Sequence, residues 1–424
     1  MWKRSRWAVG GVMPMMVAAV AGSGWLLLAP GSTLAFLVWL AAVLLALAGD
    51  GHDRLRWLVG AVLLLVVLPI AGVANSFLLE LTVQIGIYAA MALGLNVVVG
   101  QAGLLDLGYA AFFAVGAYTW AIFGSTQAGA FLGGHFPLSG DFFYLFLFVA
   151  VLTTACVGVF IGLPALRLRG DYLAIVTLAM GEVVRVLANN LDHPINITNG
   201  PQGITPIARP SIGWFGSLLH HLGITVPTQL WYPLFFYLLV LVLIGLVTLV
   251  NVRLSDSPLG RAWVAIREDE VAARAMGIAL LRTKLMAFAT GAAFSGAMGV
   301  VFAAKQLFVS PESFTLAQSI LILAMVILGG MGSIRGAIMG AALVTVLNLQ
   351  ILKSLSEYLN MLRQSGTILD LGFWHYDLGL LPTQLEPAKY ERLVFGIILV
   401  LMMIFRPEGL LPSRRASMEL HQGK

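Results

Sequence analysis

The residues best placed to do chemistry are the few ionisable side chains inside long apolar stretches of this chain. They are Glu80, Asp106, Glu182 and Arg185. A charge in hydrocarbon costs several kcal/mol, so such residues are candidates for function. Glu182 and Arg185 are three positions apart and would share one helix face, which predicts an intramembrane ion pair enclosed in a helix bundle. Glu80 and Asp106 fall near the ends of their stretches, where a side chain can reach the interface.

A second group of polar residues lies between 94 and 109, where one apolar stretch gives way to the next. Its members are Asn96, Gly100, Gln101, Gly103, Asp106 and Tyr109. Glycines at this point permit a broken helix whose freed backbone groups line a polar cavity. A tight turn packed against neighbouring helices explains the same residues equally well. The residues themselves leave both interpretations open.

The segment 253–284 has the polar pattern of a soluble helix, although it lies between two apolar stretches. Ser257 can cap such a helix, and Pro258 suits its first position, where a missing N–H is harmless. The predicted helix places four side chains on one stripe, namely Trp263, Arg267, Glu270 and Arg274. This stripe suits docking to another protein. Because Glu270 and Arg274 are also in the favourable i,i+4 order, an exposed helix lying on the membrane is the alternative.

Other kinds of chemistry have no matching pattern in the sequence. The Gly-rich turn 328–336 lacks the Gly-Lys-Ser/Thr ending of a phosphate-binding loop and follows no predicted strand, so nucleotide binding is not expected. The seven histidines are scattered, with His220-His221 as a loop pair, so no catalytic cluster is indicated. The single Cys156 excludes an intramolecular disulfide. We therefore expect no cofactor, no metal site and no enzymatic activity in this chain.

Composition indicates the framework that must position these residues. Hydrophobic residues make up 59% of the 424-residue chain and charged residues 11%, whereas soluble domains carry about 25% charge. A chain that crosses lipid must satisfy its backbone groups internally, which favours helices of about 20 residues. The sequence therefore predicts an all-α, polytopic transmembrane bundle of about 10–12 spans. The candidate spans are 8–28, 34–49, 57–74, 77–99, 102–123, 142–165, 171–189, 231–252, 284–304, 316–330, 337–352 and 391–405.

The formal net charge of +5 indicates orientation in a membrane rather than binding to nucleic acid. When the N-terminus is placed inside, most of the 25 Lys and Arg residues fall in segments on that side. Cytoplasmic loops of membrane proteins carry such an excess. We therefore expect a multi-pass protein in contact with membrane lipid, with both termini cytoplasmic.

The chain is expected to fall into three parts. Residues 1–76 hold three candidate spans with almost no polar residue, which predicts an N-terminal membrane extension. Residues 77–352 form the working core and include the polar segment described above. The remainder, 353–424, is an outside loop, a closing span and a basic cytoplasmic tail. Small residues at helical spacing, such as Gly158 and Gly162, indicate close helix packing.

Several motifs of this core resemble one known family. They are Gly94–Tyr118, Gly170–Leu178, Asn199–Ile204, Gly260–Gly277, Ile327–Ser333 and Phe405–Leu411. Together they resemble the LivM-type permease subunits of ATP-driven importers for branched-chain amino acids, over most of 77–412. The resemblance implies a permease that admits leucine, isoleucine or valine through the inner membrane of a bacterium, with segment 94–109 as one wall of the translocation path. Residues 1–76 look like the extension of the longer, high-affinity members.

The resemblance also gives the polar segment a role. Permeases of ATP-driven importers typically carry, in a cytoplasmic loop, Glu-Ala-Ala, three residues and then Gly. The loosely matching stretch here has one residue inserted after the Glu and no following Leu-Pro. The implied ATPase-coupling helix includes Trp263, Arg267, Glu270, Ala272, Ala273, Arg274 and Gly277. The implied partners are a second permease subunit of similar fold, two cytoplasmic ATPase subunits and a periplasmic amino-acid-binding protein, which would contact the outside surface at 190–230.

Two alternatives remain beside this interpretation. The first is a urea or short-chain amide permease of the same family. The second, from a different class, is a self-sufficient secondary transporter. Such a transporter would need an ion-coupling site, and the candidate spans contain no ladder of acids and histidines.

Overall fold

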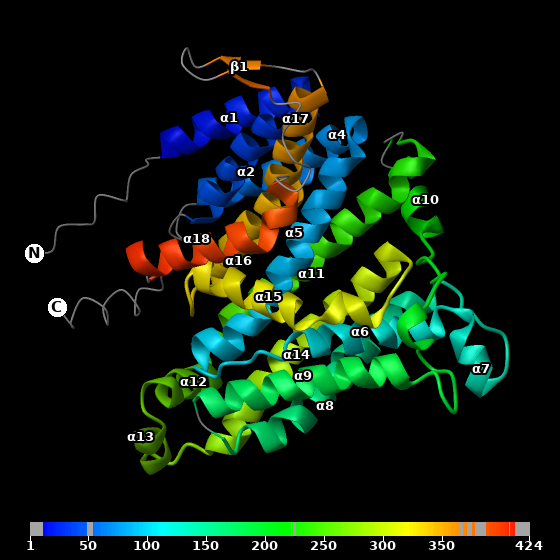
Figure 1. Cartoon of the computed structure of the whole chain (residues 1–424), viewed down its shortest axis with the longest axis vertical. Coiled ribbons are helices and arrows are strands. Elements are labelled where there is room, and N and C mark those ends of the chain that lie inside the picture. Colours follow the sequence, from blue (N-terminus) through cyan, green and yellow to red (C-terminus); the bar gives the residue numbers. More distant parts are fainter. Residues whose placement is uncertain are drawn as a thin grey trace, which may run out of the picture. The chain divides into compact units, whose positions relative to one another are not determined.

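The structure, a computed structural model, is built almost entirely of helices in the part of the chain that it describes (Figure 1). The described residues are 12–48, 54–168, 170–221, 223, 226–364, 368–370, 375–377, 387–406 and 408–411. A short antiparallel hairpin, β1 (Ile368–Asp370) with β2 (His375–Asp377), is an exception. The predicted all-α class is confirmed, and each candidate span overlaps a helix.

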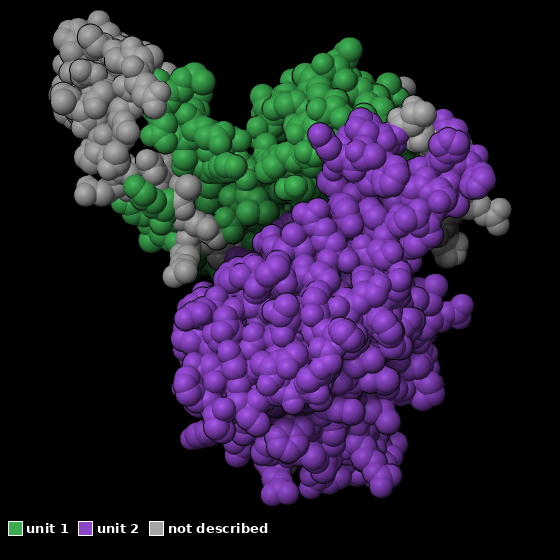
Figure 2. All heavy atoms as spheres, turned by 90° about the vertical axis from the view of Figure 1, so that its right-hand side faces the viewer, with its two compact units in different colours: residues 1–82, 342–407 green, residues 83–341, 408–424 purple. Residues whose placement is uncertain are grey.

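The chain divides into two compact units, which Figure 2 colours separately. The first comprises residues 1–82 and 342–407. Its elements include the start of α5 (Ser76–Leu95) and the end of α16 (Ile334–Val346). The others are α1 (Val12–Leu28), α2 (Thr33–Ala48), α3 (Arg54–Val62), η1 (Leu63–Val67), α4 (Leu68–Ala74), η7 (Leu347–Leu352), α17 (Lys353–Gln364), β1, β2, η10 (Pro387–Tyr390) and α18 (Glu391–Phe405).

In this first unit, residues from the N-terminal helices contact residues 350–354. The hydroxyl groups of Thr33 and Ser354 lie 3.2 Å apart, and Gln350 Nε2 donates to Thr33 Oγ1 at 3.1 Å. Lys353 Nζ lies over the Phe77 ring, 5.6 Å from its centroid. Residues of the N-terminal extension and of the last third of the chain therefore pack together. Their polar side chains form hydrogen bonds with one another.

The second unit comprises residues 83–341 and 408–424. It holds the rest of α5, and α16 up to residue 341. The other elements are η2 (Asn96–Gln101), α6 (Ala110–Phe123), η3 (Thr126–Ala128), α7 (Gly129–Leu132), α8 (Phe142–Ala165), α9 (Asp171–Asn190), η4 (Gly200–Gln202), α10 (Gly213–His221), η5 (Thr228–Leu230), α11 (Trp231–Asp256), α12 (Pro258–Glu268), α13 (Glu270–Ala275), α14 (Leu280–Gln306), η6 (Pro311–Phe314) and α15 (Leu316–Gly329).

Helix α14 is the centre of this unit and packs most extensively against α8 and α6 (Figure 1). The contacts are close because glycines replace side chains there. A Cβ at Gly116 would collide with the backbone of Gly296, and a Cβ at Gly158 would lie 2.7 Å from the Cβ of Ala292. Small residues allow this approach in lipid, where no hydrophobic force draws helices together. The packing role predicted for Gly158 is confirmed.

Six helical stretches of the described chain are long and apolar enough to cross a membrane. They are Ser76–Gln101, Phe142–Ala165, Thr228–Asp256, Leu280–Gln306, Pro311–Gly329 and Ile334–Met361. Shorter apolar helices cover four more candidate spans, and the last part of the closing one. The predicted span 171–189 is helical as α9 but carries Asp171, Glu182 and Arg185, so it is less apolar than the others. The protein is a multi-pass membrane protein.

Candidate functional site

The polar segment between α11 and α14 contains two helices rather than the single predicted one. At the start of α12, Ser257 Oγ accepts a hydrogen bond from the Gly260 N–H at 3.2 Å. The chain becomes extended at Asp269, whose carboxylate accepts from the N–H groups of Val271 at 2.7 Å and Ala272 at 3.0 Å. Asp269 is thus the cap of a new helix, α13. The prediction of one continuous helix is wrong because this cap ends the first helix and begins the second.

Trp263 lies inside the chain instead of on a docking surface. Its side chain is fully buried, and its Nε1–H donates to the Thr283 carbonyl at 2.8 Å. On the same helix, Arg267 Nη1 donates to the Gly100 carbonyl at 2.5 Å. Two side chains of the predicted stripe therefore contact other parts of the chain: Trp263 contacts α14, and Arg267 contacts the end of η2. Trp263 is not available to anchor a partner.

Glu270 pairs with Lys284 of α14, with 3.0 Å between Oε1 and Nζ. The Lys284 side chain is 5% exposed and that of Glu270 is 25% exposed. Arg274, the residue expected to pair with Glu270 within the segment, is exposed to solvent. The Glu270 carboxylate thus contacts a cation on another helix, fourteen residues further along the chain. An argument from helical spacing does not find such a partner.

Breaking this pair should destabilise the protein. We expect Glu270→Gln to leave Lys284 as a buried, uncompensated charge, at a cost of about 3 kcal/mol. The double variant Glu270→Gln/Lys284→Met should recover part of that loss because no buried charge remains. Thermal unfolding of the purified chain in detergent measures both, with Glu268→Gln as the control at a neighbouring exposed carboxylate. Unfolding midpoints that agree among Glu270→Gln, the control and the wild type would rule out a stabilising pair.

The segment 94–109 is a broken helix whose side chains pack against other elements. The π-helical turn η2 follows α5, and residues 102–109 are not helical before α6 begins. Hydrogen bonds hold the segment in place: Gly332 N–H to Asn96 Oδ1 at 2.8 Å, Gln101 Nε2 to Ser255 Oγ at 2.9 Å, Gly108 N–H to Asp106 Oδ1 at 2.9 Å and Tyr109 OH to the Gly291 carbonyl at 2.9 Å. These contacts favour the packed turn over the cavity wall.

Gly103, a member of this group, lines an open space. It borders a cavity of about 340 Å³ that also touches Arg267, Glu270 and Lys284. The other candidate path residues, Asn96, Gly100, Gln101, Asp106 and Tyr109, are not in its lining, and all five are buried. The cavity therefore joins the end of the broken helix to α12, α13 and the start of α14.

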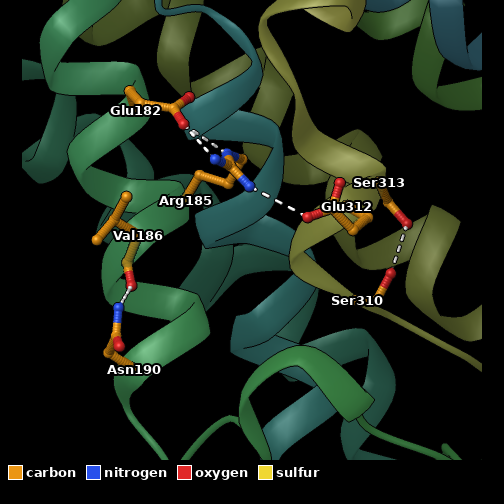
Figure 3. A network of polar contacts seen from close by, with 7 residues as sticks. All are labelled: Glu182, Arg185, Val186, Asn190, Ser310, Glu312 and Ser313. Atoms are coloured by element: carbon orange, nitrogen blue, oxygen red, sulfur yellow. Dashed lines mark hydrogen bonds and ion pairs between the residues drawn. The ribbon is translucent and has the colours of Figure 1, made fainter.

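Glu182 and Arg185 of α9 lie together, and a third charged residue joins them (Figure 3). Arg185 Nε donates to Glu182 Oε1 at 2.8 Å, and Arg185 Nη1 lies 3.1 Å from Oε1 of Glu312 on η6. The side chain of Glu182 is 43% exposed and that of Glu312 is 69% exposed. The expected enclosure of this pair within the bundle is wrong, because α9 turns this polar edge to the surface of the chain. Glu312 was missed because it lies 127 residues from Arg185 in sequence.

Comparison with known proteins identifies the family to which this framework belongs. The family described as "Branched-chain amino acid transport system / permease component" matches residues 77–403. This chain belongs to that family. The matched region begins one residue after the start of α5, so helices α1 to α4 lie outside it.

The relatives within the family cover most of this permease. It is 40% identical over 378 residues to the high-affinity branched-chain amino acid transport system permease protein LivM of Escherichia coli K12, covering 85% of this chain and 77% of the relative. It is 40% identical over 350 residues to LivM of Salmonella typhimurium, covering 80% and 71%. The probable LivM of Methanocaldococcus jannaschii is 26% identical over 355 residues, covering 78% and 91%. No solved structure matches this chain.

Proposed function

We propose that this chain is the permease subunit of an ATP-driven importer and forms part of the translocation path for leucine, isoleucine and valine. The observation that carries the proposal is 40% identity to LivM of Escherichia coli over 85% of this chain. The family match over residues 77–403 and the apolar helices support the same role.

The proposed assembly contains further components of three kinds. A second permease subunit of similar fold completes the path, two ATPase subunits hydrolyse ATP, and a periplasmic protein delivers the amino acid. The permease itself is non-catalytic. The excess of Lys and Arg in alternate segments supports an inner-membrane orientation with both termini cytoplasmic. We place the contact with the binding protein at 190–230, where α10 exposes Trp214 and Leu218.

Uptake by the reconstituted complex tests the proposal directly. Proteoliposomes that hold both permeases and the ATPases should accumulate leucine when the binding protein and ATP are supplied. Omission of this chain should abolish uptake. Uptake of urea or a short-chain amide without any uptake of leucine, isoleucine or valine would favour the other branch of the family.

We place the ATPase contact on α13, which has one anchored face and one exposed face. The anchored face packs through Ala273 against the buried cluster of Ile266 and Leu280. On the exposed face, the side chains of Val271 and Met276 are 69% and 84% exposed. Exposed apolar side chains on a short capped helix suit a docking interface. Gly277, with a φ of 86°, follows this helix and allows the chain to turn toward α14.

Charges on this exposed face should prevent docking without disturbing the fold. We expect the variant Val271→Asp/Met276→Asp to lower copurification of the ATPase subunits by about tenfold or more, because two apolar contacts become desolvated carboxylates. Affinity purification from membranes measures this, and the thermal unfolding midpoint of the purified chain checks its folding. Leu218→Asp on α10 is the matched control at another exposed apolar position. Full copurification with the α13 variant would place the ATPase contact elsewhere.

A further inference from the structure

The cavity beside the polar segment has walls of two chemical kinds. Its charged residues come from the start of α9, from α12 and α13, and from the start of α14: Asp171, Arg267, Glu270 and Lys284. Its aliphatic residues are Leu104, Leu105, Leu168, Leu173 and Ile266. Among the described residues of the lining, the charged side chains are two cations and two anions. A wall that carries charges of both signs beside an aliphatic wall suits a ligand that has both charges and an apolar side chain.

The charged residues retain hydrogen-bonding capacity beyond the contacts they make within the chain. Lys284 has three N–H donors and Arg267 has five. Within the chain, Lys284 Nζ pairs with Glu270 Oε1, and Arg267 Nη1 donates to the Gly100 carbonyl. The remaining donors can bind a carboxylate. Asp171, in the first turn of α9, is exposed and supplies an acceptor for an ammonium group.

We propose that this cavity binds the zwitterion of an aliphatic α-amino acid. The carboxylate of the ligand lies toward Lys284 and Arg267, its ammonium group toward Asp171, and its side chain against the leucines. The volume of about 340 Å³ is at the small end of ligand pockets, which range from about 300 to 1,000 Å³. The identity of the ligand rests on the proposed function, since the cargo of the importer is the amino acid that this wall suits.

Such a site differs from a path through the middle of the spans. Glu270 belongs to α13, where we place the ATPase contact, and Arg267 belongs to the adjoining α12, so the bound amino acid touches the docking helix itself. The site is thus on the side of the chain from which the amino acid leaves in the proposed orientation. Occupancy of the site and docking of the ATPase subunits are linked, because both involve α13.

Protection of an engineered thiol tests the site in the assembled complex. With Cys156→Ser as the background, Leu105→Cys places one thiol of this chain in the cavity, and Leu168→Cys provides a second reporter if the first fails to assemble. Leucine, without the binding protein, should slow maleimide labelling of this chain by about fivefold or more in nanodiscs. Glycine and 4-methylpentanoate should not, because the first lacks the aliphatic side chain and the second lacks the ammonium group. A thiol at Asp256→Cys, outside the cavity lining, is the control for direct effects of leucine on labelling.

The contribution of the ammonium contact is measured with a matched pair of variants. Asp171→Asn should raise the leucine concentration for half-protection by about tenfold, whereas Asp256→Asn should leave it unchanged. Equal labelling with and without leucine, in a complex that imports leucine, would overturn this site and leave the proposed function intact. A complex that neither imports leucine nor shows protection would overturn both. Protection that Asp171→Asn does not alter would contradict the proposed orientation of the ligand.

Discussion

Replacing Trp263 with alanine is expected to destabilise the folded chain by about 3–5 kcal/mol. The indole is fully buried, so its removal leaves a cavity between α12 and α14 and takes away the donor to the Thr283 carbonyl. Trp263→Phe should have an intermediate effect, because it retains most of the buried ring and loses the hydrogen bond, which contributes about 1 kcal/mol. The thermal unfolding midpoint of the purified chain in detergent measures both variants.

The result separates an internal role of Trp263 from a role in docking. Trp25→Ala removes a partly exposed indole from α1 and serves as the control. If Trp263 acted at a partner interface, Trp263→Ala would unfold at the same temperature as the control and would lose only the ATPase subunits. We expect instead that Trp263→Ala unfolds at a lower temperature than the control. Any loss of the ATPase subunits should then follow from this loss of stability.

Gly116→Leu should have an effect of similar size, through overpacking instead of a cavity. A side chain at Gly116 would meet the backbone of Gly296, which cannot move aside as a flexible side chain can. We expect a loss of about 3 kcal/mol or more, seen as a lower unfolding midpoint and as aggregation in size-exclusion chromatography. Even Gly116→Ala should be harmful, since its single Cβ already collides.

Gly245→Ala is the matched control for this variant. Gly245 also lies within a helix, α11, but a Cβ built there meets no heavy atom within 4 Å beyond its chain neighbours and its own helix backbone. Alanine is favoured over glycine in a helix by about 1 kcal/mol, so this variant should be neutral or slightly stabilising. An unchanged unfolding midpoint for Gly116→Leu would show that α6 and α14 can separate at low cost.

The spans could be predicted because each depends on a local property, the length of an apolar run. The Ser257 cap and the packing glycine Gly158 could be identified in the same way. These features depend on residues a few positions apart. The break between α12 and α13 could also have been found, because Asp269 followed by Glu270 is a helix-start signal inside a helical pattern.

The candidate sites were harder to predict because their contacts join distant parts of the chain. Asn96 receives its hydrogen bond from Gly332, 236 residues away. Gln101 is 154 residues from Ser255. Polar residues in a span look functional in the sequence whether they line a path or hold neighbouring helices, and only these partners decide between the two. The first compact unit could not be predicted for the same reason, because its N-terminal and C-terminal helices are far apart in the sequence.

The extended residue Asp269 has a mechanical consequence. It separates α12 from α13, and each helix has its own polar attachment to α14: Trp263 bonds to the Thr283 carbonyl, and Glu270 pairs with Lys284. α13 is attached to α14 through the Glu270–Lys284 ion pair and through Ala273, which packs against Leu280 of α14 and Ile266 of α12. Where α14 meets α6, at Gly296, backbone lies on backbone and no side chain can yield to absorb the movement. We therefore expect a force applied at α13 to reach α14 and, through it, the tight contact with α6.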